Sequence, residues 1–129
     1  MKKILLVEDT VLLAEEIVDI LRLEGYDVTH ALNGVLGILL LPEIHPDIII
    51  TDLLMPGMNG FEFIKRVKVM PGLKSVPIII LSAKISDEDM LLGIQAGADD
   101  FIQKPCKASV LLSSIRAFTD RDKGTTGDH

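Results

Sequence analysis

The sequence has little cysteine and little positive charge, and it has no long apolar run. Cys106 is the single cysteine of the 129 residues, so no intramolecular disulfide can form, which fits a reducing cytoplasm. The formal net charge of −6 argues against direct binding to nucleic acid or to an anionic membrane, because both favour basic patches. The longest apolar stretch, 35–41, is far shorter than the ~20 residues of a membrane span. We therefore expect a cytoplasmic domain.

The length predicts one domain with a substantial core. Short apolar runs alternate with segments of helical periodicity along the chain, and this alternation predicts a parallel sheet with helices on both faces. The expected strands are 4–7, 26–31, 48–51, 76–81 and 100–103. The expected helices are 10–24, a helix from Asn33 with its exit bounded by Pro42 and Pro46, 60–70, 86–95 and 107–120. We expect residues 1–120 to form the domain and the polar residues 121–129 to be a tail or the start of a linker.

The strand expected at 48–51 is the centre of the prediction. Its three consecutive isoleucines are typical of a strand that is buried on both faces. Asp52 follows at once, and then Pro56 and Gly57 provide turn residues. Asp52 should therefore lie at the carboxyl end of a central strand, which is the edge where open α/β sheets bind ligands.

Polar side chains also follow the other expected strands. Glu8 and Asp9 come after the first strand, Ser82 after the fourth and Lys104 after the fifth. In a parallel sheet these ends lie on the same edge as Asp52, so three carboxylates, a hydroxyl and an ammonium should converge.

These groups together suit the binding of a divalent cation and the transfer of a phosphoryl group. Crowded carboxylates repel one another unless a cation relieves them, and hard oxygen ligands beside water suit Mg²⁺. Asp52 has the character of a nucleophile toward a phosphoryl group. Lys104 and Ser82 can then contact other phosphoryl oxygens. A dinucleotide site is not expected, because the turn at Glu8 and Asp9 has no glycine and would repel a bare phosphate.

These motifs resemble the receiver domain of the two-component response-regulator family. The resemblance covers about Lys2 to Phe118 and rests on five short motifs in order along the chain. They are Val7-Glu8-Asp9, D-L-L-M-P-G-M-N-G from Asp52 to Gly60, Leu81-Ser82-Ala83, G-A-D-D-F from Gly97 to Phe101, and Lys104-Pro105. The resemblance implies an α/β, flavodoxin-like, doubly wound (βα)5 fold, a three-layer sandwich with the strand order 2-1-3-4-5.

The resemblance also implies roles for the acidic residues. Asp52 resembles the phosphoacceptor. Glu8 and Asp9 resemble the acidic pair that binds Mg²⁺ (or Mn²⁺) together with Asp52, and the Leu54 carbonyl resembles a further ligand. The donor would be a sensor histidine kinase or a histidine phosphotransfer protein.

Four other positions match the family's motifs. Lys104 resembles the phosphate-binding lysine, and it is followed by Pro105, for which the family implies a cis peptide bond. Ser82 and Phe101 resemble the switch pair that remodels the face made by 86–95, 100–103 and 107–120. That face is also where a homodimer is expected, and a downstream effector or a fused output domain would read the change.

Two positions that vary in such domains bear on the lifetime of the phosphorylated form. Leu54 is apolar and offers no group to orient an attacking water, and Lys84 is long enough to cover the phosphoryl group. We expect slow self-dephosphorylation. By the same resemblance, the helix near Thr10 and Ala14 and the loop at Pro105 would receive the phosphoryl donor.

The residues at this edge also bear on two alternative functions. An aspartyl-nucleophile phosphatase of the haloacid-dehalogenase type needs a second aspartate two residues after the nucleophile, where this chain has Leu54. A receiver-like interaction module that is not phosphorylated would not need Asp52 and Lys104 intact. The chain is therefore expected to catalyse its own phosphorylation and dephosphorylation and no independent reaction.

Overall fold

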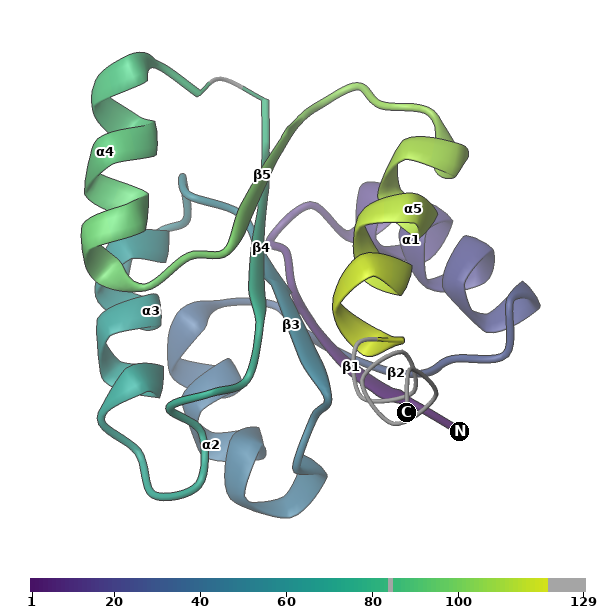
Figure 1. The fold of residues 1–129 in the computed structure, drawn as a ribbon, viewed down its shortest axis with the longest axis horizontal. Coiled ribbons are helices and arrows are strands. Elements are labelled where there is room, and N and C mark those ends of the chain that lie inside the picture. Colours follow the sequence, from purple (N-terminus) through teal and green to yellow (C-terminus); the bar gives the residue numbers. More distant parts are fainter. Residues whose placement is uncertain (84, 121–129) are drawn as a thin grey trace, which may run out of the picture.

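The computed structural model describes residues 1–83 and 85–120, which fold as alternating strands and helices (Figure 1). In chain order they are β1 (Lys3–Val7), α1 (Val11–Leu23), β2 (Asp27–Ala31), α2 (Gly34–Ile44), β3 (Ile48–Thr51), α3 (Gly60–Lys68), β4 (Ile78–Ser82), α4 (Asp87–Ala96), β5 (Asp100–Gln103) and α5 (Ala108–Thr119). No helix within the described ranges is long and apolar enough to cross a bilayer.

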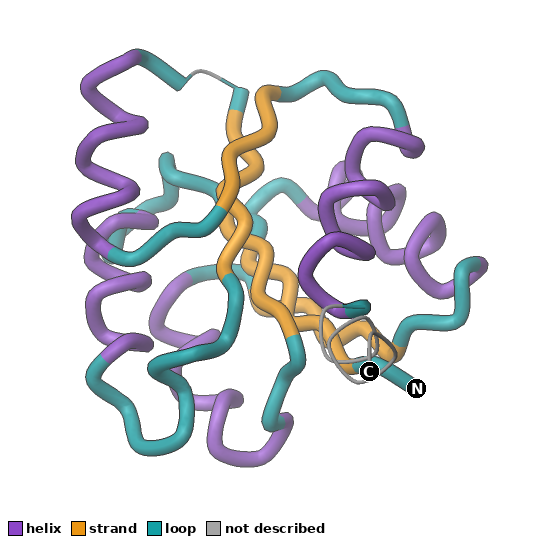
Figure 2. Tube along the Cα trace, viewed as in Figure 1, coloured by secondary structure: helices purple, strands orange, loops and turns teal. Residues whose placement is uncertain are grey.

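The strands form one parallel sheet in the order β2-β1-β3-β4-β5. Helices α1 and α5 cover one face, and α2, α3 and α4 cover the other, with the sheet between the two layers (Figure 2). This architecture confirms the flavodoxin-like (βα)5 sandwich. Because all strands run in the same direction, their carboxyl ends meet at one edge, and β1 and β3 lie side by side at its centre.

Strand β3 is buried on both faces, as its isoleucines predict. Ile48 and Ile50 belong to the core cluster beneath α1 and α5, and Ile49 belongs to the cluster on the opposite face. All three side chains have 0% exposure. Burial of an isoleucine side chain stabilises the fold by about 1.5–3 kcal/mol, so β3 fixes the position of Asp52 strongly.

Local signals explain most helix boundaries, and α4 is the clearest case. The Ser86 hydroxyl accepts from the Asp89 N–H at 3.0 Å, and the Asp89 carboxylate accepts from the Ser86 N–H at 3.0 Å. This reciprocal capping box satisfies two donors at the start of the helix.

The helices and strands begin and end within two residues of their predicted bounds. Helix α2 ends at Ile44, between Pro42 and Pro46 as predicted, with Pro42 inside its last turn. Pro42 is exposed, so water can solvate the carbonyl that its missing N–H leaves free, while the burial of Leu41 holds the last turn to the core. Strand β4 begins at Ile78 and not at 76, because Pro77 has no N–H to donate to the sheet.

Candidate functional site

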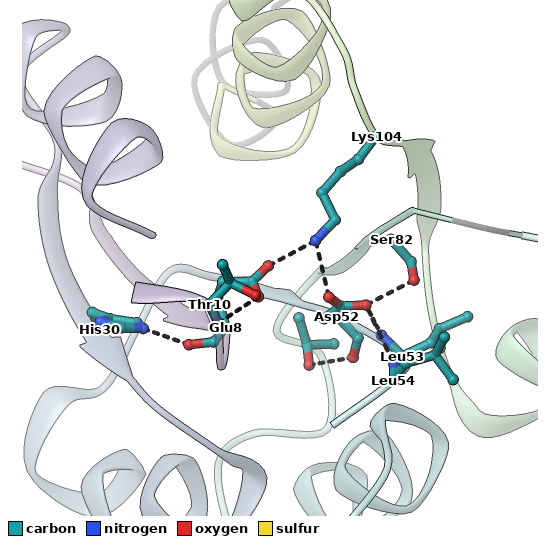
Figure 3. A network of polar contacts seen from close by, with 9 residues as sticks. Glu8, Thr10, His30, Asp52, Leu53, Leu54, Ser82 and Lys104 are labelled. Carbon is teal, nitrogen blue, oxygen red and sulfur yellow. Dashed lines mark hydrogen bonds and ion pairs between the residues drawn. The ribbon is translucent and has the colours of Figure 1, made fainter. Parts of the chain in front are cut away.

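The residues predicted to converge do so at the carboxyl edge of the sheet (Figure 3). Glu8 and Asp9 leave the end of β1, and Asp52 leaves the end of β3 beside them. Their carboxylate oxygens lie within 4.8 Å of one another. Ser82 reaches the group from β4, and Lys104 reaches it from the residue after β5.

Asp52 is 7% exposed, and its two carboxylate oxygens have different surroundings. Oδ1 accepts from the Leu53 N–H at 2.6 Å, from the Leu54 N–H at 3.3 Å and from the Ser82 hydroxyl at 2.7 Å. Oδ2 accepts from Lys104 Nζ at 2.9 Å. One oxygen is thus fixed by three donors, while the other faces a single ammonium.

The backbone around Asp52 explains why its side chain is fixed. The Asp52 N–H donates to the Val7 carbonyl at 3.2 Å, which extends the β1–β3 pairing into the site. The following loop returns so closely that a Cβ on Gly60 would lie 2.3 Å from the Asp52 carbonyl oxygen. Glycine is therefore required where α3 begins, and α3 is anchored directly beneath the Asp52 peptide.

Glu8 is the most deeply buried acid of the site, with 2% exposure. Its Oε2 accepts from the Thr10 N–H at 3.0 Å, and its Oε1 accepts from Lys104 Nζ at 2.9 Å. Asp9, in contrast, is exposed. Glu8, Asp9 and Asp52 together form the acidic edge of the sheet. This acidic edge is exposed to solvent at Asp9 and buried at Glu8.

Lys104 links two acids with one ammonium. Burial of the ammonium disfavours its charged form, but the hydrogen bonds to Glu8 and Asp52 outweigh this, so the pKa of Lys104 is raised above 10.5. Lys104 is therefore cationic at neutral pH and neutralises part of the charge of the three carboxylates.

The donor set fits a hard divalent cation. Among the described residues, three carboxylates face one ammonium, which leaves an excess of negative charge, and exposed Asp9 gives access to water. Mg²⁺ prefers one or two carboxylates together with water molecules, so Glu8, Asp9 and Asp52 suit it chemically.

The remaining predicted residues lie at or beyond the rim. Leu54 is 69% exposed, and the Lys104–Pro105 peptide bond is cis. Phe101 is half-buried on β5 and lies against Gly93 of α4, away from the carboxylates. Lys84 lies outside the described residues.

Sequence reasoning missed the donors that hold the acids. The N–H groups of Leu53, Leu54 and Thr10 have no signature, because any residue with a backbone N–H can supply them. It also missed His30, whose Nε2 lies 2.7 Å from the Glu8 carbonyl oxygen. The signal for His30 lay only in its position at the end of the strand beside β1.

With this fold and this acidic edge, the chain belongs to the response regulator receiver domain family, whose sequence profile matches residues 4–116. It is a receiver of two-component signal transduction, the pathway in which such domains accept phosphoryl groups.

The chain is 38% identical over 121 residues to the DNA-binding response regulator MtrA of Mycobacterium tuberculosis, covering 94% of this chain and 52% of that protein. It is 36% identical over 128 residues to the transcriptional regulatory protein AfsQ1 of Streptomyces coelicolor, covering 99% and 56%. The chain thus spans about half the length of the curated relatives it matches.

Solved structures show the same fold. The signal receiver domain of a signal transduction histidine kinase from Syntrophus aciditrophicus matches with a TM-score of 0.85 and 38% identity, covering 93% of this chain and 91% of that one. The chemotaxis protein CheY4 of Vibrio cholerae matches with a TM-score of 0.89 and 31% identity, covering 92% and 98%. Similar receivers therefore occur in a DNA-binding regulator, a histidine kinase and a chemotaxis protein.

Proposed function

We propose that Asp52 accepts a phosphoryl group from the phosphohistidine of a sensor histidine kinase or a histidine phosphotransfer protein. The observation that carries this proposal is the Asp52 carboxylate itself, which is held between Lys104 and Ser82 at the acidic edge. Neither alternative activity has a comparable feature, since the position that an aspartyl phosphatase would use for its second acid is the exposed Leu54.

The asymmetry of the carboxylate supports Oδ2 as the attacking atom. Oδ1 of Asp52 is fixed by three donors, so Oδ2 is the oxygen with lone pairs free to attack phosphorus. The new O–P bond forms as the P–N bond of phosphohistidine breaks, and the leaving imidazole takes a proton from solvent. Lys104 moves from Oδ2 to a phosphoryl oxygen and neutralises its charge there.

Glu8, Asp9, Asp52 and the Leu54 carbonyl are the groups that would hold Mg²⁺ (or Mn²⁺), which when bound supplies charge neutralisation. The Leu54 N–H donates to Asp52 Oδ1 at 3.3 Å, so residue 54 lies next to the acceptor carboxylate. Water returns the protein to its free state by hydrolysing the acyl phosphate. The domain catalyses these two reactions on itself and turns over no independent substrate.

The switch uses Ser82 and Phe101. Ser82 now donates to Oδ1 of Asp52, and it would turn toward the phosphoryl group once that is present. Phe101 lies two residues from the end of β5 and contacts α4, so a change in its ring position alters the face made by α4, β5 and α5. The output is a population shift of that face, which a homodimer partner or an effector can read.

The donor would dock over α1 and the loop after β5. A cleft of about 400 Å³ lies there beside Lys104 and is lined mainly by apolar groups, among them Leu13, Ile17, Pro105 and Leu111. Its position next to the phosphate-binding lysine suits a partner that must bring phosphohistidine to Asp52.

The phosphorylated form should be long-lived, because Leu54 presents an apolar side chain at the rim where a polar one could orient water. The second residue of that prediction, Lys84, lies outside the described part of the chain. A half-life of seconds for the acyl phosphate would contradict this proposal.

A cytoplasmic setting is part of the proposal, and the family is consistent with it. We place the receiver, residues 1–120, in the cytoplasm, with residues 121–129 as a tail or linker to an effector or output domain. The relatives that are DNA-binding response regulators carry about as much chain again beyond the matched part. Contact with DNA would belong to such an output domain, and the receiver itself contacts neither nucleic acid nor membrane.

The test is intact mass after incubation with acetyl phosphate and Mg²⁺. We expect one metal-dependent phosphoryl adduct on the wild type and none on Asp52→Asn. Asp19→Asn, which changes an exposed acid of α1, is the matched control and should still take the adduct. An adduct that persists in Asp52→Asn would contradict the assignment.

A further inference from the structure

Two hydrogen bonds join the end of β2 to Glu8, the first residue after β1. The Glu8 N–H donates to the Ala31 carbonyl at 3.0 Å, and His30 Nε2 lies 2.7 Å from the Glu8 carbonyl oxygen (Figure 3). A carbonyl oxygen can only accept, so the hydrogen of this bond is on Nε2. The edge strand thus holds both the N–H and the C=O of Glu8.

The position of His30 follows from the register of the sheet. His30 pairs with Leu6 in the parallel ladder, and it lies two residues after Val28, whose side chain packs in the core beneath α1 and α5. His30 therefore shares that face of the sheet. From its position opposite Leu6, the imidazole reaches beyond Val7, the last residue of β1, and brings an N–H to the Glu8 carbonyl oxygen. An aliphatic side chain has no donor to offer there.

The Glu8 carbonyl belongs to the peptide that joins Glu8 to Asp9. Holding this peptide plane fixes the directions in which the two carboxylates leave the backbone. The Glu8 carboxylate is held by the Thr10 N–H and Lys104, whereas Asp9 is exposed and keeps a carboxylate oxygen within 4.8 Å of those of Glu8 and Asp52. Within the described part of the chain, the Thr10 N–H and Lys104 hold the Glu8 side chain, whereas His30, on the edge strand β2, holds the Glu8 backbone.

We propose that His30 is a positioning residue for the metal-binding acids: its Nε2–H fixes the Glu8–Asp9 peptide, so that the carboxylates are arranged for a divalent cation before the cation arrives. The inference rests on the proposed function of Glu8 and Asp9 as metal ligands. Partners that orient ligands in this way typically change metal affinity 10- to 100-fold when they are removed.

The test compares His30→Leu with His30→Gln. Leucine keeps an apolar body but has no donor, whereas the glutamine amide places an N–H at nearly the same reach as Nε2. We expect the dissociation constant for Mg²⁺, followed by amide NMR shifts, to rise about tenfold in His30→Leu. It should stay within about threefold of wild type in His30→Gln. His45→Asn is the matched control, since His45 is exposed in a left-handed conformation that asparagine accepts.

Two further readouts separate positioning from a general structural role. In the metal-free wild type, the nitrogen NMR spectrum of the His30 ring should show a protonated Nε2. Thermal unfolding should place all three variants near wild type, so that a loss of affinity is not a loss of fold. An unprotonated Nε2, or a His30→Leu protein that binds Mg²⁺ as tightly as wild type, would overturn the inference. His30→Gln failing as badly as His30→Leu would overturn it too.

The same experiment distinguishes this inference from the proposed function. Phosphorylation by acetyl phosphate is measured on the wild type alongside the Mg²⁺ titration. A wild type that binds Mg²⁺ but takes no phosphoryl group contradicts the function of Asp52 and leaves the role of His30 to be judged by affinity. A wild type that is phosphorylated while His30→Leu is unimpaired in Mg²⁺ affinity contradicts the role of His30 alone.

Discussion

Removing the ammonium from the acidic edge should cost stability that a metal ion can restore. Lys104→Met keeps most of the side-chain length but removes the charge that lies 2.9 Å from Glu8 Oε1 and 2.9 Å from Asp52 Oδ2. The lysine side chain is 13% exposed, and the carboxylate side chains are 2% and 9% exposed. The two acids are then left close together without their shared cation.

The magnitude follows from this partial burial. Exposed ion pairs contribute about 0–1 kcal/mol, whereas breaking a fully buried pair costs about 3–5 kcal/mol. The site is nearly buried at Glu8 but open to water at Asp9, so we expect the metal-free variant to lose about 2 kcal/mol of unfolding free energy. Mg²⁺ neutralises the same carboxylates that Lys104 does. It should therefore bind Lys104→Met more tightly than wild type and stabilise it by a larger amount.

Phosphorylation should respond in the opposite direction. Lys104→Met removes the ammonium that, among the described residues, lies against Asp52 and would neutralise a phosphoryl oxygen, and loss of one such contact typically slows a reaction about 10²- to 10³-fold. Tighter Mg²⁺ binding together with slower phosphorylation is a combination that a simple folding defect does not produce.

The assay is urea unfolding followed by circular dichroism, with and without saturating Mg²⁺, and phosphorylation by acetyl phosphate on the same samples. Lys107→Met is the matched control, because Lys107 is exposed three residues further along the chain. If Lys104→Met unfolds at the same urea concentration as wild type, or gains no more stability from Mg²⁺, the electrostatic reasoning is refuted.

Three other predictions concern the same edge and its switch. Gly60→Ala places a Cβ 2.3 Å from the Asp52 carbonyl oxygen, so it should lower the unfolding free energy by about 3 kcal/mol and slow phosphorylation. Thermal unfolding and the mass of the phosphoryl adduct measure the two effects, and a variant as stable as wild type contradicts the geometry. Gly93→Ala places a Cβ 2.6 Å from Phe101 Cε2, so overpacking of about 1–3 kcal/mol should exceed the gain of about 1 kcal/mol in helix propensity. In a Phe101→Ala background the same change should cost less, because only Ile80 Cδ1, 3.0 Å from the new Cβ, remains close. A urea-based double-mutant cycle in which the cost does not depend on the ring refutes this contact. The raised pKa of Lys104 means that its contribution to stability is fully present below pH 10.5 and is lost as the pH rises through the higher folded value. The stability difference between wild type and Lys104→Met should therefore narrow in alkali, and a difference that widens would contradict the sign.

Most strands and helices could be predicted because buried positions are occupied by apolar residues at regular spacing in the sequence. The isoleucines of β3 predicted a strand covered on both faces, and the structure places Ile48 and Ile49 in opposite core layers. The exit of α2 was predicted between Pro42 and Pro46, and the helix ends there at Ile44. Pro42 fits inside the last turn because a proline near the exposed end of a helix costs less than one in its interior, and the buried Leu41 holds that turn to the core.

The charged side chains of the site could be predicted from the sequence, but the groups that orient them could not. Side chains with charge, such as Asp52 and Lys104, could be placed at one edge from the parallel topology alone. The groups that orient them could not, because backbone donors carry no residue signature. His30 lies 22 positions from Glu8 in the chain, so only the strand register brings the two together.

The most direct test of the central claim is chemical mapping of the phosphorylated residue. The protein is phosphorylated with acetyl phosphate and Mg²⁺, the acyl phosphate is reduced with borohydride to an alcohol, and the peptides are sequenced by mass spectrometry. We predict the reduced side chain at position 52 and at no other acid, with Glu8 and Asp9 unchanged. Reduction at Glu8 or Asp9, with Asp52 intact, would contradict the account of this carboxylate as the acceptor.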